Sequence, residues 1–245
     1  MRPRLELSRA QRVLWLLEEL QVPYQLKVYK RGSDWLADPA LRNVHPLGKS
    51  PVVTVQAPGS PQSLVLAESA AITEYLCDYY GKWLVPRRYV EGKEGQVGGE
   101  TESWLRYRHY MHYAEGSIMP LVVVSFLVDG IKNGPVPFFI RPITNAIAGK
   151  ISKMFLQANF ETHYKFLESQ LETSPQGGGF LCGPELTAAD ILMSFPLLAG
   201  EKTASMSKDK FPRVWQYVQK LHETDGYKRS VKKIEELGGD WRITM

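Results

Sequence analysis

Hydrophobic positions in residues 9–20 recur at the spacing of an α-helix. One stripe of this segment holds Ala10, Val13, Leu14, Leu17 and Leu20. This spacing predicts an amphipathic helix whose apolar side packs against a core. Ser8 stands directly before the segment, where an N-cap residue belongs.

Strand patterns follow this helix. Residues 24–28 alternate between apolar and polar side chains, and residues 52–55 form a β-branched run. That run, a turn at Gly59 and residues 64–66 predict a hairpin, and Ser69 then opens a second helix. With a weakly supported strand before residue 9, the order is strand, helix, strand, loop, strand, strand, helix. This order is the plan of a thioredoxin-like α/β domain.

The pattern changes at Gly81. Residues 81–99 hold Pro86 and five glycines and show no clear period, which is typical of a linker. Beyond it the patterns are helical: residues 100–128, with a bend expected at Pro120, then residues 147–171 and 214–224. The sequence therefore predicts a thioredoxin-like domain over residues 1–82, a linker over 83–99 and an all-helical domain over 100–245.

Charge does not indicate a nucleic-acid partner. The net charge is +4, from 30 basic and 26 acidic side chains mixed along the chain. The densest basic stretch, residues 228–233, runs into Glu235 and Glu236. We interpret it as the solvated face of a helix.

Cysteine usage and hydropathy favour a cytoplasmic protein. Cys77 and Cys182 lie far apart in the sequence, which argues against a disulfide framework or a zinc site. The start of the chain shows no signal-peptide pattern. The most apolar run, residues 118–128, is shorter than the roughly 20 residues of a transmembrane helix, so we expect a buried helix instead.

Ser8 is the first candidate for chemistry. At a helix start its hydroxyl lies beside unpaired backbone N–H groups and the positive end of the helix dipole. A thiolate bound there would be stabilised, which lowers the pKa of the thiol. The alternative is a plain N-cap.

Ser50 and Pro51 form the second candidate. A proline directly ahead of a strand is a place for a cis peptide bond, and the backbone of Ser50 would then be available to pair with an extended peptide ligand. An ordinary trans bond is the alternative.

Glu68 and Ser69 form the third candidate. The helix N-terminus would bind a carboxylate and Glu68 an ammonium group, so the pair would recognise the end of an α-amino acid. A helix cap beside a favourably placed acid is the alternative.

One further helix is rich in aromatic and histidine residues. His109 and His112 are spaced for a metal, but no cysteine or carboxylate completes a set, so we predict no metal site. We expect the aromatic residues to form mostly core, with Tyr107 and Met111 as candidates for an apolar substrate pocket. Thr187 and Asp190 are spaced as a capping box, and we assign Asp190 a structural role.

Four segments together resemble the serine-type cytosolic glutathione transferases. Residues 8–20 resemble the first helix of that family, residues 45–52 its cis-proline loop, residues 66–72 its Glu-Ser motif and residues 180–190 the capping box of its helical domain. The segments come in family order at family spacing. Residues 114–121 and 137–143 are most similar to the fungal and bacterial branch.

The resemblance implies a cytoplasmic homodimeric enzyme that takes part in detoxification or the stress response. It transfers the thiol of glutathione, its co-substrate, to a small electrophile, or it reduces peroxides. Ser8 would donate to the sulfur, Lys49 would face the glycine carboxylate, Ser50 and Pro51 would hold the backbone, and Glu68 and Ser69 the γ-glutamyl end. The family's first strand usually begins earlier than this chain allows, so we expect either a shortened strand or an N-terminally trimmed gene product.

Two other functions remain open on the same scaffold. One is a protein that binds glutathione or hydrophobic ligands without turnover. The other is a glutathione-dependent isomerase or biosynthetic transferase. The fold does not distinguish them, and the sequence does not identify the electrophile.

Overall fold

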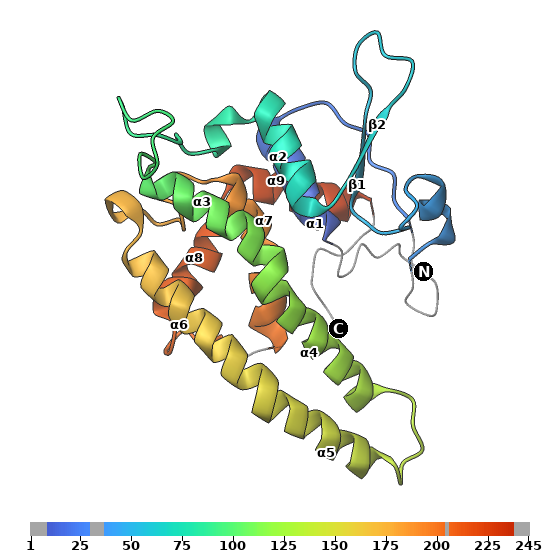
Figure 1. The fold of residues 1–245 in the computed structure, drawn as a ribbon. Helices are drawn as coiled ribbons and strands as arrows, with labels where there is room; N and C mark the ends of the chain where they lie inside the picture. Colours follow the sequence, from blue (N-terminus) through green and yellow to red (C-terminus); the bar gives the residue numbers. More distant parts are fainter. Residues whose placement is uncertain (1–8, 30–36, 204–205, 238–245) are drawn as a thin grey trace. The chain divides into compact units, whose positions relative to one another are not determined.

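The computed structural model describes residues 9–29, 37–203 and 206–237, and leaves out the side chains of residues 200–203. The chain forms two compact units (Figure 1). The first extends to Pro86 and includes the segment from Leu221 onward, and the second comprises Arg87–Lys220. The last helix thus lies in the first unit. The domain boundaries at residues 82 and 100 stay a prediction.

Helix α1 (Ala10–Leu20) is central to the first unit. It packs against both α2 (Ser69–Tyr80) and α9 (Asp225–Glu236). Because two helices flank it, every residue from Gln11 to Leu16 is buried, and not only the apolar stripe. The ring of Trp15 meets that of Tyr227 edge-on at 5.3 Å. The helix predicted over residues 9–20 is confirmed.

Helix α9 approaches α1 closely at Gly226. A Cβ atom at this position would lie 2.0 Å from Oε2 and 3.1 Å from Cα of Glu19. Further along α9, Ser230 and Ile234 are buried while Lys228 and Lys232 are exposed. The interpretation of the basic stretch as a solvated helix face is confirmed.

The sheet of the first unit is a hairpin. Strands β1 (Val52–Val55) and β2 (Leu64–Ala67) pair antiparallel, with Val52 opposite Ala67 and Val55 opposite Leu64. The predicted hairpin is confirmed. The strand predicted over residues 24–28 is wrong, since these residues have no regular secondary structure. A strand needs a neighbouring strand with which its backbone N–H and C=O groups can pair. The strand predicted before residue 9 lies outside the described residues.

Two long antiparallel rods shape the second unit (Figure 1). One runs through α3 (Glu102–Tyr113), the π-helix η3 (Ala114–Ile118) and α4 (Met119–Asn133). The other runs through α5 (Arg141–Ile151), the π-helix η4 (Ser152–Gln157) and α6 (Ala158–Glu172). Helix α7 (Ala188–Thr203), which packs on α3 and α4, and helix α8 (Pro212–His222) follow. Three short 3₁₀ helices complete the described elements: η1 (Pro39–Asn43), η2 (Lys82–Leu84) and η5 (Pro175–Gly177).

The first rod is irregular just ahead of Pro120. The bend was predicted at Pro120 itself, whereas the structure places a π-helical turn over Ala114–Ile118. Proline lacks an N–H group, and its ring would clash with the carbonyl four residues earlier, on Gly116. A wider turn relieves that clash and keeps the helix continuous.

Length and composition would allow one helix among the described residues to cross a membrane. This helix is Glu102–Asn133, whose most apolar window has a mean hydropathy of 1.6 and is 39% buried. This helix is longer than the apolar run at residues 118–128, because less apolar helical residues precede and follow that run. The core helix of a soluble protein passes the same test, so the observation is weak evidence for a span.

Asp190 secures the start of α7. Its Oδ2 accepts hydrogen bonds from the backbone N–H (2.8 Å) and hydroxyl (2.6 Å) of Thr187. Its Oδ1 accepts from the N–H of Leu181 (3.1 Å) and the hydroxyl of Tyr217 (2.8 Å). Only one of the two hydrogen bonds of a capping box forms, the one from the Thr187 N–H to the Asp190 side chain. The Thr187 hydroxyl donates to the Asp190 carboxylate instead of accepting from the backbone N–H of Asp190. Burial raises the pKa of Asp190, and the four hydrogen bonds offset part of that effect.

Candidate functional site

The loop that leads into β1 is built around Gly48 and Pro51. The N–H of Gly48 donates to the carbonyl of His45 at 2.9 Å. Gly48 has φ +58°, and a Cβ there would lie 2.7 Å from Cγ of Arg42, so the turn requires glycine. The peptide bond between Ser50 and Pro51 is cis, which confirms the prediction from the sequence. Lys49 and Ser50 are exposed.

The hairpin register brings the second and third candidate motifs together. Val52 is paired with Ala67, so Ser50 and Pro51 lead into the same end of the hairpin from which Glu68 and Ser69 leave. The two motifs come from opposite strands. An extended ligand lying along Ser50 would therefore run toward the start of α2.

Glu68 has a strained backbone at this point. Its φ is 70° and its ψ 121°, and its side chain is exposed. A positive φ is uncommon for any residue other than glycine, and such strain gathers at ligand clamps and active sites. The strained residue is the one whose carboxylate was predicted to bind an ammonium group.

Ser69 does not cap α2 as the sequence predicted. Glu68 holds the N-cap position, no side chain caps this helix end, and Ser69 is its first residue. The buried Ser69 hydroxyl instead accepts a hydrogen bond from Nη2 of Arg12 at 3.2 Å. Arg12 was not predicted as a site residue, because in the sequence it is only a charged residue beside the apolar stripe of residues 9–20.

The N-terminus of α2 is suited to an anion. Since no side chain caps it, its first backbone N–H groups are open to a carboxylate, and the helix dipole favours negative charge there. The exposed carboxylate of Glu68 lies at the same helix end. This arrangement can recognise the two charged groups of an α-amino acid.

Ser8, the predicted catalytic residue, lies outside the described residues. The residue after it, Arg9, holds the N-cap position of α1 and has helical backbone angles, φ −56° and ψ −14°. Its side chain makes no capping hydrogen bond. The role of Ser8 stays a prediction.

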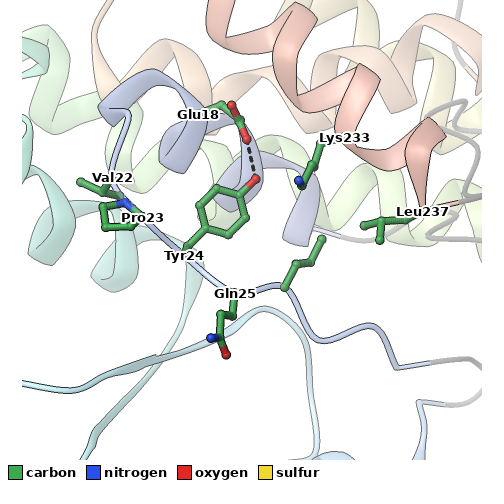
Figure 2. A pocket seen from close by; sticks show the side chains of 8 residues that line it. Glu18, Val22, Pro23, Tyr24, Gln25, Lys233 and Leu237 are labelled. Carbon is green, nitrogen blue, oxygen red and sulfur yellow. Dashed lines mark hydrogen bonds between the residues drawn. The ribbon is translucent and has the colours of Figure 1, made fainter.

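A hollow of about 450 Å³ in the first unit has none of these motif residues in its lining (Figure 2). It is lined by Glu18, Val22, Pro23, Tyr24, Gln25, Leu26, Lys233 and Leu237. The Tyr24 hydroxyl donates to the Glu18 carboxylate, and burial together with this acid raises the pKa of Tyr24. Arg229 donates to the backbone carbonyl of Glu18 at 2.7 Å. These polar contacts tie α9 and residues 22–26 to the end of α1.

The predicted second-substrate residues are core residues of the second unit. Tyr107 is 3% exposed and Met111 1% exposed. Neither lines the hollow of about 370 Å³ on this helix, which Glu102, Leu105, Arg106, His109, Tyr110, Phe166 and Gln170 surround. Tyr110 and Tyr113 are also buried, so the expectation of a mostly structural aromatic cluster is confirmed.

Neither thiol of the chain is suited to act as a nucleophile. Cys77 and Cys182 are both free and buried, and burial raises the pKa of the Cys77 thiol to about 12. A thiol with a raised pKa is a poor nucleophile. In the described part of the chain, no three His, Cys, Asp or Glu residues are grouped to hold a metal ion.

Comparison with known proteins agrees with this geometry. Residues 8–78 match the family model of the glutathione S-transferase N-terminal domain, and residues 139–229 match that of the C-terminal domain. Glutathione S-transferase 1 of Saccharomyces cerevisiae is 28% identical over 97% of this chain and 96% of its own length. Glutathione S-transferase 3 of Schizosaccharomyces pombe is 30% identical over 94% of this chain and 85% of its own length.

Solved structures show the same architecture. A glutathione S-transferase from Actinobacillus pleuropneumoniae has a TM-score of 0.63 and 26% identity over 96% of this chain and 97% of that chain. A glutathione transferase homologue from Lodderomyces elongisporus, crystallised with two GSH per subunit, has a TM-score of 0.69 and 15% identity, and the match covers 94% of this chain and 98% of that chain.

The chain therefore belongs to the glutathione S-transferase family. The predicted fold class, a thioredoxin-like domain followed by a helical one, is confirmed. Membership of this family supports glutathione transferase function.

Proposed function

We propose that this protein joins glutathione to a small apolar electrophile, or uses glutathione to reduce peroxides. The observation that carries the proposal is the hairpin register, which brings the backbone of Ser50 and the clamp of Glu68 and Ser69 to one end of the hairpin. Solved structures of the same fold with bound glutathione support the choice of ligand.

Glutathione would lie extended along Ser50, whose backbone N–H and C=O pair with the tripeptide as a strand does. Its γ-glutamyl ammonium group would meet Glu68, and the γ-glutamyl carboxylate the N-terminus of α2. Lys49 would face the carboxylate of the glycine residue. These contacts bind both ends of the tripeptide and leave its sulfur at the centre.

Ser8 would donate a hydrogen bond to the sulfur and favour the thiolate. In conjugation the thiolate forms a bond to the electrophilic carbon and the leaving group departs with its electron pair. In peroxide reduction two glutathione molecules are oxidised to the disulfide, and the peroxide becomes an alcohol and water. Tyr107 and Met111 stay candidates for the apolar pocket. Catalysis would rest on thiolate stabilisation and proximity.

The resemblance to the family further favours a cytoplasmic homodimer that acts in detoxification and the stress response. It also favours domain limits of 1–82 and 100–245 around a linker. Sedimentation velocity measures the subunit count directly. A single species at the mass of one chain, 27.8 kDa, would contradict the dimer.

Two assays on the purified chain test the proposal. Titration calorimetry with glutathione should show saturable binding. Incubation with glutathione and a halogenated dinitrobenzene should release halide at a rate that depends on the enzyme. Binding without turnover of this electrophile, of a peroxide or of an isomerisable substrate would instead favour a non-catalytic binding protein.

A further inference from the structure

The far end of the α4 and α5 helices exposes an apolar surface. We define the apolar tip as six residues: Leu127, Ile131, Phe138, Phe139, Ile143 and Ile147. Phe138 is 84% exposed, Phe139 66%, Leu127 63% and Ile143 60%. Large apolar side chains that gather exposed on one part of a protein mark an interaction site.

The pattern along both helices leads to this exposure. Leu127 and Ile131 are four residues apart on α4, on the side away from the buried Val122, Ser125 and Val128. On α5 only Ala148 is buried, and Ile143 and Ile147 form an outward stripe. Helix α5 packs on α4, and Figure 1 shows their joining loop at the free end of the two rods. The tip is therefore available for contact.

The loop between the helices presents its aromatic rings in a defined arrangement. Pro135 and Pro137 restrict the backbone, and the N–H of Ile140 donates to the carbonyl of Pro137 at 2.9 Å. The rings of Phe138 and Phe139 meet edge-on at 5.7 Å. Because the turn is closed already, little backbone entropy is lost when this loop binds a partner.

The charged residues on the helices that carry the tip are mostly basic. Between Glu115 and Glu161 the sequence contains four basic residues, Lys132, Arg141, Lys150 and Lys153, but a single acid, Asp129. All four basic residues are exposed. Asp129 is half-buried and interacts electrostatically with Lys132. The apolar tip is thus bordered by positive charge with little to balance it.

This sign determines which partner fits. In a two-fold dimer through the tip, the same surface of each copy faces the other, so both sets of basic residues would meet without acidic partners. An anionic bilayer surface suits both the apolar side chains of the tip and the basic residues around it. Its headgroups attract Lys and Arg, and its acyl boundary takes up Phe, Leu and Ile. We propose that the apolar tip docks the protein on anionic lipid membranes, independently of the proposed glutathione chemistry.

Vesicle flotation with the full chain tests this proposal. Vesicles of phosphatidylcholine alone are compared with vesicles that contain about one third phosphatidylserine. We expect at least tenfold more protein on the anionic vesicles at low salt, and a decrease in 0.5 M salt, because the attraction is screened. Equal binding to both kinds of vesicle, or none, would overturn the proposal.

Matched variants locate the surface. Phe138→Ser with Phe139→Ser, and separately Lys150→Glu with Lys153→Glu, should each lower binding to the anionic vesicles at least tenfold. The controls are Trp83→Ser, which replaces an aromatic residue that is 63% exposed, and Lys208→Glu with Lys210→Glu at two exposed lysines. These controls should stay within twofold of wild type.

Two further measurements distinguish lipid docking from misfolding and from self-association. All substituted residues are exposed, so circular dichroism and the melting temperature should not change. Sedimentation velocity without lipid identifies the other occupant of the surface, a second copy of the chain. If the Phe138 and Phe139 variant dissociates a dimer and vesicle binding is unchanged, the tip is a self-association surface and the lipid proposal is wrong.

Discussion

Arg12 on α1 donates a buried hydrogen bond to the hydroxyl of Ser69, 3.2 Å away at the first residue of α2. The bond joins the helix that follows Ser8 to the helix end that is predicted to hold the γ-glutamyl group. Two helices whose joined residues, Arg12 and Ser69, lie 57 positions apart in the sequence are thereby connected through one guanidinium group. Neither helix alone predicts this connection.

Removal of the Ser69 hydroxyl should weaken both folding and binding. Ser69→Ala takes an acceptor from the buried guanidinium of Arg12, so we expect the free energy of unfolding to fall by about 1–3 kcal/mol. Glutathione affinity should fall as well, because the start of α2 loses a fixed contact. Urea unfolding and calorimetry measure the two effects. Ser63→Ala, at an exposed serine of the same unit, should change neither, and equal effects of both variants would show that Arg12 is not involved.

Two substitutions of Glu68 distinguish the effect of its strained backbone on stability from the effect of its carboxylate on ligand binding. Glu68→Ala and Glu68→Gly both remove the carboxylate, so each should weaken glutathione binding by about 1–3 kcal/mol. Only glycine relieves the strain at φ 70°. The Gly variant should therefore be more stable than the Ala variant by about 1 kcal/mol. Unchanged affinity in both variants would remove Glu68 from the site.

Asp190 should be needed for stability and not for chemistry. Asp190→Ala leaves the buried donors of Leu181, Thr187 and Tyr217 without this acceptor, and we expect a loss of about 3–5 kcal/mol. Tyr217→Phe removes a single donor and should cost about 1–2 kcal/mol. Thermal melts measure both losses. Activity per folded molecule should stay at the wild-type value in Tyr217→Phe, and a selective loss of activity there would contradict the structural role.

Acid should destabilise the second unit through His163. Burial lowers the pKa of His163, whose Nδ1 lies in hydrogen-bond contact with the Tyr113 hydroxyl. In the unfolded chain the ring titrates near 6.5, so below about pH 7 the unfolded state binds more protons and stability falls. The melting temperature should decrease between pH 7.5 and 5.5. His163→Gln should flatten this decrease, whereas His112→Gln, at an exposed histidine, should leave it unchanged.

The sequence predicts local elements better than their neighbours. The stripe of residues 9–20 predicts α1, but α9 alongside it is separated by two hundred residues, and only the fold shows why Gln11 and Arg12 are buried. The alternation at residues 24–28 predicts a strand, but alternation does not ensure a partner strand. Pro120 predicts an irregular helix, and its missing N–H moves the irregularity to the preceding turn.

The candidate site shows the same limit. The cis bond at Ser50 and Pro51 and the position of Glu68 follow from motifs within the sequence. The hydrogen bond from Arg12 to Ser69 depends on helix packing, and no periodicity encodes it. Ser69 was predicted as a cap because serine favours that position, but the strained Glu68 occupies the cap and leaves the helix end open for a ligand.

The most direct test of catalysis by this protein is the pH dependence of glutathione conjugation in wild type and Ser8→Ala, with thiolate absorbance recorded in parallel. We expect wild type to turn over at neutral pH. Ser8→Ala should bind glutathione with similar affinity but show a higher thiol pKa, closer to the free value near 8.5, and slower turnover at neutral pH. Identical profiles would show that Ser8 does not act on the thiol. Glutathione binding with no turnover in wild type would contradict the assignment of this protein as an enzyme.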